Sequence, residues 1–159
     1  MMHAVDPDFE KRTRDSFARQ PAMATLGVAM QSVTPGRVVL MMTHRETLTQ
    51  QHGFLHGGMI ASGLDSACGY AAFSLMPIEA AVLTIEFKLN FLAPARGPLF
   101  QFEGVVVKAG RTINVVDGRA TQHDAPSGEP QLIATMSAKS SMSIFSSWLA
   151  APNSGVITY

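Results

Sequence analysis

The chain contains little cysteine and carries no net charge. Cys68 is the single cysteine among 159 residues, so no disulfide can form within the chain. Lys plus Arg and Asp plus Glu number 12 each, which gives a formal net charge of zero. This balance excludes a global field that would recruit nucleic acid or a membrane surface, and we predict neither as a partner. We therefore expect any anionic ligand to be bound by a local cluster of basic side chains.

The sequence also lacks a secretory signal and a convincing membrane span. Residues 1–19 are too charged for a signal peptide. The most apolar stretch, residues 59–76, contains Asp65 and is closed by Pro77. A charge at the centre of a spanning helix costs about 2.5–3.5 kcal/mol on insertion scales, so we predict a cytoplasmic protein that does not enter the membrane.

The length and the spacing of apolar residues predict one domain over residues 1–159, with a helix before residue 20, a core over 21–143 and a tail over 144–159. Residues 7–20 predict a short amphipathic helix that packs on the rim, and residues 57–76, rich in Ala, Leu and Met, predict a long buried one. The predicted strands are residues 24–33, 37–43, 81–92, 99–108, 112–122 and 131–142. This order predicts an α+β architecture in which an antiparallel six-stranded sheet wraps the long helix.

The clearest strand pattern lies in residues 81–92, where apolar and polar positions alternate. The apolar positions are Leu83, Ile85, Phe87, Leu89 and Phe91, and the polar ones between them are Thr84, Glu86, Lys88 and Asn90. A twofold alternation is typical of a strand with one buried face. We therefore expect the odd-numbered side chains to point into the core.

Asp65 is the only formal charge between Thr47 and Ile78, and it follows the histidine of His56-Gly57-Gly58 by nine positions. A buried carboxylate without a cationic partner carries a desolvation penalty of several kcal/mol, so either backbone donors satisfy it or chemistry uses it. Small residues at Gly57, Ala61 and Gly69 flank it at a spacing of four along one helix face. That face indicates either close helix–sheet packing or a ligand groove.

A resemblance to a known family rests on four features. They are Gln50, the His56-Gly57-Gly58 tripeptide, Asp65, and the segment 83–94 followed by the Gly110-Arg111 turn. In this order they resemble the hotdog-fold acyl-CoA thioesterases of the phenylacetate-pathway (PaaI) type, over residues 20–143. The resemblance implies a hotdog fold, hydrolysis of an acyl-CoA thioester to free acid and CoA, no cofactor, and a homodimer with active sites built from both chains.

The resemblance also implies roles for particular residues. The amide of Gly57, at the positive end of the helix dipole, would polarise the thioester carbonyl. Asp65 of the partner subunit would act as general base on water or as a nucleophile that forms an anhydride, and the sequence does not separate these routes. Gln50 would orient the water or the carbonyl, with Gln51 as its rival. Thr84 is the hydroxyl nearest to the position where relatives support the nucleophilic water.

The remaining candidates have weaker signals. His56 is expected to cap the helix start and position the substrate rather than to transfer protons. Gly58, Arg96, Lys108 and Arg111 are candidates for binding CoA, and Arg111 is the preferred partner of the nucleotide phosphates.

Two other kinds of site are expected to be absent. Cys68 has no nearby base or cation and is expected to be a core residue rather than a nucleophile. No spacing of His, Cys and carboxylates resembles a metal site, so we predict no metal.

Two other functions and several details stay open. A hotdog hydratase acting on enoyl-CoA would need a downstream Asn and a longer overhanging segment, which the sequence does not show. An acyl-CoA-binding hotdog protein without catalysis would keep the groove but not the acid. The acyl group, whether aryl-acetyl, aromatic or medium-chain, is not readable, nor is the choice between CoA and an acyl carrier protein. Edge-to-edge pairing predicts the dimer, and two dimers are expected to associate further.

Overall fold

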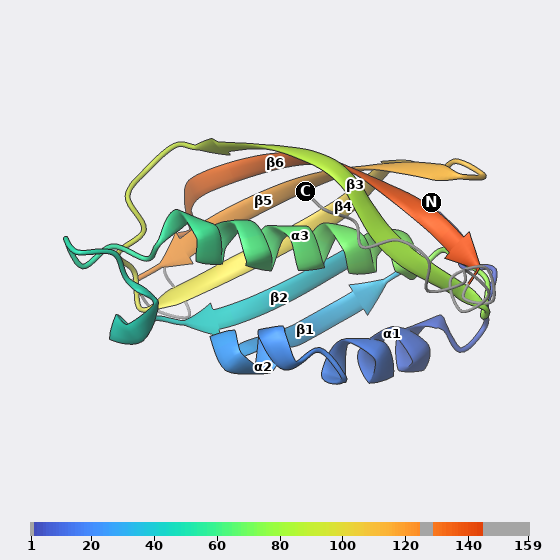
Figure 1. Ribbon diagram of the computed structural model, residues 1–159, viewed down its shortest axis with the longest axis horizontal. Coiled ribbons are helices and arrows are strands. Elements are labelled where there is room, and N and C mark those ends of the chain that lie inside the picture. The colour runs from blue at the N-terminus through green and yellow to red at the C-terminus, as the bar shows by residue number, and fades with distance from the viewer. Residues whose placement is uncertain (1, 125–128, 145–159) are drawn as a thin grey trace, which may run out of the picture.

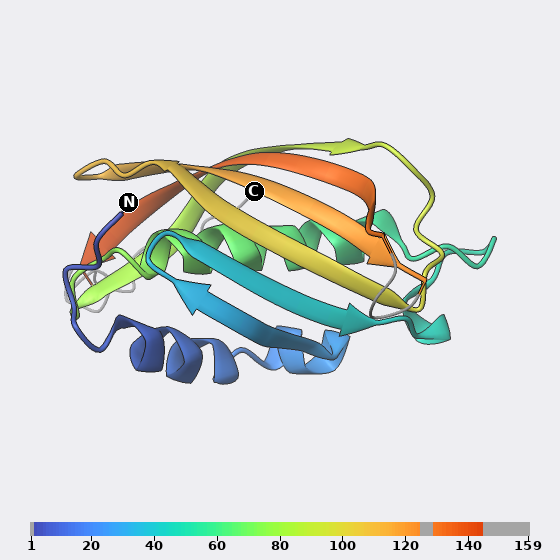
Figure 2. The ribbon, with the colours of Figure 1, turned by 180° about the vertical axis from the view of Figure 1, so that it is seen from behind.

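The computed structural model describes residues 2–124 and 129–144, and in this part an antiparallel sheet wraps one long helix, α3 (Gly57–Phe73) (Figure 1). The six-stranded sheet has the order β1-β2-β4-β5-β6-β3 with antiparallel neighbours throughout, which confirms the predicted α+β class. The strands are β1 (Val28–Thr34), β2 (Arg37–Thr43), β3 (Ala80–Phe91), β4 (Leu99–Lys108), β5 (Ile113–His123) and β6 (Gln131–Ile144). Figure 2 shows the sheet from behind, with α3 on its far side.

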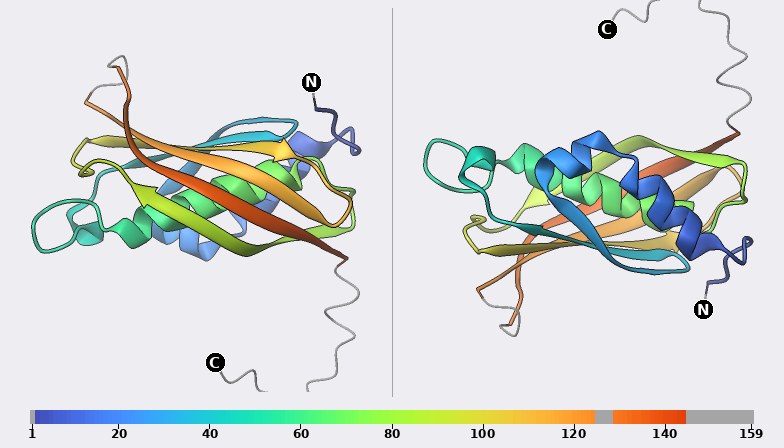
Figure 3. Two further views of the ribbon diagram at one scale, coloured as in Figure 1. Left: turned by 90° about the horizontal axis from the view of Figure 1, so that it is seen from above. Right: turned by 90° about the horizontal axis from the view of Figure 1, so that it is seen from below.

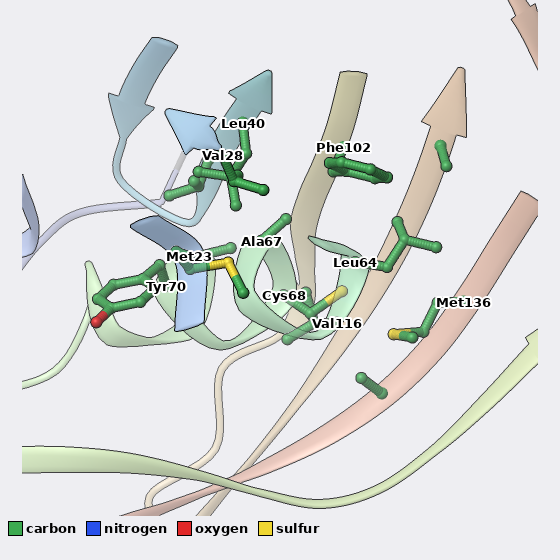
Figure 4. Packing of buried hydrophobic residues seen from close by; sticks show 14 of the residues in the cluster. Met23, Val28, Leu40, Leu64, Ala67, Cys68, Tyr70, Phe102, Val116 and Met136 are labelled. Atoms are coloured by element: carbon green, nitrogen blue, oxygen red, sulfur yellow. The ribbon is translucent and has the colours of Figure 1, made fainter. Parts of the chain in front are cut away.

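Close packing of α3 on the sheet explains why the helix carries so few large side chains. A Cβ at Gly63 would lie 2.6 Å from the ring of Phe102, and a Cβ at Gly104 would collide with the backbone carbonyl of Ala67. Leu64 and Cys68 point from the helix toward the strands that carry Val116 and Met136, and all are buried (Figure 4). These contacts allow the helix axis to lie close to the sheet, which maximises dispersion contacts.

The face of α3 that carries Asp65 is not the face that packs on the sheet. A Cβ added at Gly69 would meet nothing within 4 Å, so this glycine borders open space. Ala61 and Asp65 are half-buried, whereas the sheet-facing Leu64 and Ala67 are fully buried. Of the two interpretations that the sequence left open, the structure therefore favours a hollow over close packing along the middle of this face.

Strand β3 does not keep the uninterrupted alternation that the sequence predicted. A bulge between Thr84 and Glu86 shifts the register against β6, so Val82 and Thr84 face α3 before the bulge and Leu89 and Phe91 face it afterwards. The prediction that all odd positions point inward is therefore wrong for its first half. The extra residue of a bulge reverses which parity faces the core, and here it turns Thr84 toward the helix.

The predicted buried face of β3 is also only partly covered within one chain. Leu83, Ile85, Phe87 and Phe91 are 43%, 55%, 45% and 56% exposed. β3 is an edge strand of the sheet, and no strand within residues 2–124 and 129–144 pairs with its outer side. The described part of one chain therefore leaves a row of large apolar side chains in solvent.

The N-terminal region forms two helices, α1 (Phe9–Ala18) and α2 (Pro21–Leu26), where the sequence predicted one helix and then a strand from residue 24. The strand prediction is wrong for residues 24–27 because Pro21 opens a helix and Gly27, at φ +70°, ends it. Seen from below, α1 lies across α3 (right view of Figure 3).

An ion pair holds the start of α1 against the end of α3. The Arg12 guanidinium bonds Asp6 at 2.7 Å and donates to the carbonyls of Phe73, the last residue of α3, and of Met76, three residues beyond it. Its charge also lies 4.3 Å from the centre of the Phe73 ring. A cation at a helix C-terminus satisfies carbonyls that have no partner within the helix, so this contact fixes how the two helices lie side by side.

Candidate active site

Asp65 lies half-buried in the middle of α3, and Thr84 of β3 binds its carboxylate. The Thr84 hydroxyl donates to Asp65 Oδ1 at 2.6 Å, a distance typical of a strong bond to a charged acceptor. No donor for Oδ2 lies in the described part of the chain. The carboxylate is thus oriented by one hydrogen bond and keeps one oxygen available.

A cavity of about 740 Å³ opens beside this carboxylate, between α1, α3 and the start of β3. Its floor contains Asp65, Gly69 and Phe73, and its walls carry Ser16 and Arg19 from the N-terminal region and residues 80–84 of β3. The volume falls within the range of small-molecule sites, about 300–1,000 Å³. A smaller hollow next to it is shared by Asp65, Ser66 and residues 20–23.

Tyr70 and Ser16 add a pair of hydroxyl groups to the lining of this cavity. Their hydroxyl oxygens lie 3.3 Å apart, and the Tyr70 ring packs against Phe17 and Phe73. Burial raises the pKa of Tyr70, so its hydroxyl stays protonated at neutral pH and can donate a hydrogen bond.

His56 caps the start of α3, as the sequence predicted. His56 Nδ1 accepts from the Gly58 N–H at 2.9 Å, and the His56 carbonyl accepts from the Met59 N–H at 2.9 Å. In the described part, the Gly57 N–H is the amide of this first turn that has no partner. It lies at the positive end of the helix dipole, where an oxyanion is stabilised.

Gln50 and Gly57 line a second hollow, which they share with Phe54, Phe91 and Leu92. The Gln50 side-chain carbonyl accepts from the His52 N–H, which closes the loop that carries it, and Gln51 is exposed outside this hollow. A Cβ at Gly57 would lie 2.8 Å from the Phe91 ring, so glycine lets β3 approach the helix start.

The structure thus brings the predicted residues together as two separate groups. Asp65 and Thr84 border one cavity, while Gln50 and Gly57 border another, next to the His56 cap. Eight residues separate Gly57 from Asp65, which corresponds to about 12 Å along the helix axis. That distance is too great for both to act on one carbonyl carbon, where reacting groups must lie about 3 Å away.

The predicted CoA-binding residues also lie apart within one chain. Arg96 precedes β4 and stacks at 4.2 Å on the Phe54 ring, near the hollow of Gly57. Lys108 and Arg111 follow at the other end of β4, about 30 Å away along a strand of this length. All three are exposed, and one chain does not join them into a single basic cluster.

Cys68 is a core residue, as predicted. It is fully buried beneath the sheet, and burial raises the pKa of its thiol to about 12, which leaves almost no thiolate at neutral pH. Within residues 2–124 and 129–144, no three His, Cys, Asp or Glu side chains gather as a metal site would require. In the same ranges, no helix has both the length and the apolar character needed to cross a membrane.

Sequence reasoning missed the contribution of the N-terminal helices, which were placed on the rim. Arg12, Ser16, Arg19 and Gln20 all border the cavity of Asp65. The amphipathic pattern around Phe17 predicted only that the segment packs somewhere. No residue of the segment carries a signal that names the helix face on which it packs.

Comparisons with known proteins agree with this geometry. The family model described as Thioesterase superfamily matches residues 52–128. A Halobacterium salinarum protein, provisionally named as an esterase, is 33% identical over 118 residues, 70% of this chain and 78% of that protein.

Two solved structures extend the comparison. A thioesterase family protein from Silicibacter pomeroyi is 56% identical, with a TM-score of 0.81 over 84% of this chain and 97% of that one. The E. coli PaaI protein from the phenylacetic acid degradation operon shares the fold at 21% identity, with a TM-score of 0.74 over 82% and 90% of the two chains. Sequence and fold together show that the chain belongs to the thioesterase superfamily and has the hotdog fold.

Proposed function

We propose that the protein hydrolyses the thioester of small aromatic or short- to medium-chain acyl-CoA to free acid and CoA. One observation carries the proposal: Asp65 holds an available carboxylate oxygen at the border of a cavity large enough for such an acyl group. Hydrolysis needs an activated water or a carboxylate nucleophile next to the bound acyl carbon, and Asp65 offers either.

We propose further that the active site is completed in a homodimer. The exposed apolar side chains of β3, among them Ile85 and Phe87, lie on a sheet edge, where pairing with a second β3 would bury them. Antiparallel pairing about a twofold axis would place the first half of β3, with Thr84, beside the second half of the partner strand, with its Phe91. That arrangement would bring the Asp65 of one chain near the Gly57 of the other.

In this dimer, the Gly57 N–H receives the thioester oxygen as negative charge develops on it. Asp65 of the other chain takes a proton from water, whose oxygen attacks the carbonyl carbon. The C–S bond then breaks, and the proton held by Asp65 passes to the departing thiolate. In the alternative route, Asp65 attacks the carbonyl carbon first and the C–S bond breaks, which releases the CoA thiolate; water then cleaves the anhydride to the free acid and regenerates Asp65, and the proton set free passes to the thiolate. Gln50 orients the carbonyl from the side of Gly57.

The basic residues fit the same arrangement. Gly58 and Arg96 lie at the helix-start end of one chain, and Lys108 and Arg111 lie at the end of the sheet where β3 begins. Twofold pairing of β3 would bring the two ends together from different chains, so that the CoA phosphates would meet cations of both. Val105, Val107 and Ile113, exposed at 39%, 58% and 46%, offer an apolar surface for the association of two dimers.

The test is thiol release from a panel of aryl and aliphatic acyl-CoAs, followed with a chromogenic thiol trap. We expect wild-type turnover and a loss of about 10³-fold or more in kcat for Asp65→Asn, because the general base is removed. Asp117→Asn, the same chemical change on an exposed strand position, is the matched control and should keep wild-type rates.

Two results would contradict the proposal. If Asp65→Asn still hydrolyses acyl-CoA at the wild-type rate, the Asp65 carboxylate takes no part in the reaction. Binding of acyl-CoA without thiol release by the wild type would instead favour a binding protein, and hydration of enoyl-CoA would favour a hydratase.

A further inference from the structure

The side-chain amide of Gln122, near the end of β5, is buried and uses its full hydrogen-bonding capacity. Its oxygen accepts from the backbone N–H groups of Arg96 and Gly97 at 2.7 and 2.8 Å. Its nitrogen donates to the Pro94 carbonyl at 3.2 Å and to the Gln131 side-chain oxygen at 2.6 Å. An amide offers two acceptor positions and two donor hydrogens, so all of them are occupied. Three of these bonds go to one turn, residues 94–97, whose backbone is thereby fixed from β5.

The turn of residues 94–97 is also attached to the loop that leads into α3. The Ala95 carbonyl accepts from the Leu55 N–H at 3.0 Å, and both residues are buried. A Cβ at Gly97 would lie 3.1 Å from the Cβ of Gln122, so the absence of a side chain lets the turn lie directly against β5. The turn is therefore held between β5 and the loop before α3.

This turn forms part of the hollow at the start of α3 and carries a cation beside it. Pro94 and Ala95 line the hollow together with Gly57. The guanidinium of Arg96, the next residue, lies 4.2 Å from the centre of the Phe54 ring, which lines the same hollow. No Asp or Glu in the described part of the chain forms an ion pair with this guanidinium. An arginine that stacks on an aromatic ring keeps its N–H groups available for an anion.

We infer that Gln122 is a positioning residue for the binding of CoA. The inference rests on the proposed thioester hydrolysis. By fixing the turn of residues 94–97, Gln122 sets the backbone position of Arg96. The guanidinium, supported by the Phe54 ring, then meets the phosphates of CoA beside the hollow. Guanidinium and phosphate pair through two parallel hydrogen bonds, and this geometry is lost when the backbone that carries the arginine moves.

The turn that carries the other two candidate cations is held less firmly. Asn114, also buried on β5, accepts from the Gly110 N–H at 3.3 Å, and within the described residues its side chain makes no other hydrogen bond. Lys108 and Arg111 of that turn are exposed. One long hydrogen bond fixes a backbone less firmly than three, so Arg96 is the candidate whose position the fold determines most strongly.

The experiment compares two thioesters of the same acyl group, one of CoA and one of N-acetylcysteamine, which keeps the reacting bond but has no phosphate. Arg96→Met removes the charge and should raise the KM for acyl-CoA about tenfold, because one charge-assisted contact is lost. Gln122→Met keeps the side-chain length without the amide and should raise this KM by a similar factor. In both variants, kcat and the KM for the N-acetylcysteamine thioester should stay within about twofold of wild type. Gln101→Met, at a half-buried position of the neighbouring strand β4, is the matched control and should behave as wild type.

The double variant Gln122→Met/Arg96→Met separates positioning from an independent effect. Because Gln122 acts through Arg96, the double variant should have the KM of Arg96→Met alone, whereas independent contributions would multiply the two factors. Gln122→Met also leaves two backbone N–H groups without an acceptor, so its Tm should fall. If it does not fold, Gln131→Met removes one bond to the same amide from an exposed position. That variant should raise the KM for acyl-CoA about two- to threefold and leave the other thioester unchanged.

Three results would overturn the inference. They are an unchanged KM for acyl-CoA in the folded Gln122→Met, or in Gln131→Met where it replaces that variant, an equal rise in KM for both thioesters, and a double variant whose factors multiply. If Asp65→Asn abolishes turnover while Gln122→Met and Arg96→Met keep the wild-type KM, the inference fails and the proposed function stands. Absence of wild-type turnover with every thioester would remove both.

Discussion

Two parts of one face of α3 behave differently: the start of the helix offers a hydrogen-bond donor, and its middle offers an acceptor. At the start, the Gly57 N–H is held ready by the His56 cap in a shallow hollow closed by Phe91. In the middle, Asp65 borders a deep cavity, and no donor among the described residues reaches its Oδ2. A donor group stabilises a developing oxyanion, and an acceptor group activates water.

In the proposed mechanism, one chain therefore carries both halves of the hydrolytic site but cannot use them on the same bond. The halves lie about 12 Å apart along one rigid helix, so no side-chain motion joins them. A second chain, related by a twofold axis, offers the simplest way to bring unlike halves together. The exposed edge of β3 lies between the two hollows and is the surface that would be shared.

The strongest test of this comparison is complementation between two inactive variants. Asp65→Asn damages the acceptor half, and Gly57→Ala places a methyl group against the Phe91 ring in the donor half. Each variant alone should be nearly inactive. Co-refolded in equal amounts, they should recover about a quarter of wild-type activity, because half of the dimers would be mixed and each would contain one intact site.

The complementation experiment gives a different result if the active site is not shared between chains. If each chain used its own Gly57 and Asp65, no mixed dimer would contain an intact site and the mixture would stay inactive. The acyl-CoA assay of the separate variants, refolded in the same way, provides the baseline.

A charged side chain on the exposed edge of β3 should prevent two chains from pairing, so that the donor half of one chain no longer meets the acceptor half of the other. Ile85→Arg places a cation at a position that is 55% exposed in one chain and would be buried in the pair. We expect sedimentation to show monomers and the assay to show a loss of kcat of about a hundredfold or more, since an unpaired buried charge strongly disfavours association. Val107→Arg, at an equally exposed apolar position of β4, is the control and should leave this dimer intact.

Removing the Thr84 hydroxyl should impair only the acceptor half of the site, the Asp65 carboxylate that this hydroxyl orients. Thr84→Val keeps the shape of the side chain but removes the donor to Asp65 Oδ1. The carboxylate then loses its orientation, and we expect kcat to fall about tenfold with little change in KM. Thr84→Ser retains the hydroxyl and should restore most of the rate, whereas equal losses in both variants would point to packing rather than to the hydrogen bond.

The smallest effect, a change in stability, is expected from the Asp6–Arg12 ion pair that holds α1 against α3. The Asp8 N–H, and then the Arg12 guanidinium, hold the pKa of Asp6 below its ordinary value of 3.8. A lowered pKa in the folded state adds stability that is fully present above about pH 3.8 and is lost as the pH falls through the folded-state pKa.

The measurement is the Tm of Asp6→Asn across this pH range. We expect a decrease of a few degrees at neutral pH, shrinking as the pH falls below about 3.8. Asp15→Asn, which removes an exposed ion pair with Lys11 on the same helix, should change the Tm by less than about one degree. A pH-independent difference for Asp6→Asn would assign its effect to packing.

The sequence predicted the elements whose patterns are local. The long apolar helix, five of the strands and the capping role of His56 follow from periodicity, Gly and Pro signals, and the helix-start tripeptide. The strand predicted from residue 24 began too early because Pro21 and Gly27 enclose a helix that is too short to show a period. Thr84 was found by its hydroxyl, although its place in the alternation pointed it to the wrong face.

What the sequence by itself determined is the donor and acceptor chemistry on one helix, because eight residues of α-helix fix the distance between Gly57 and Asp65. What only the tertiary structure decided is which groups from elsewhere meet that helix. The bulge in β3 turns Thr84 toward Asp65, and the packing of α1 brings Gln20 to the same hollow. Both depend on contacts between segments far apart in the chain, and such contacts leave no period in the sequence of either segment.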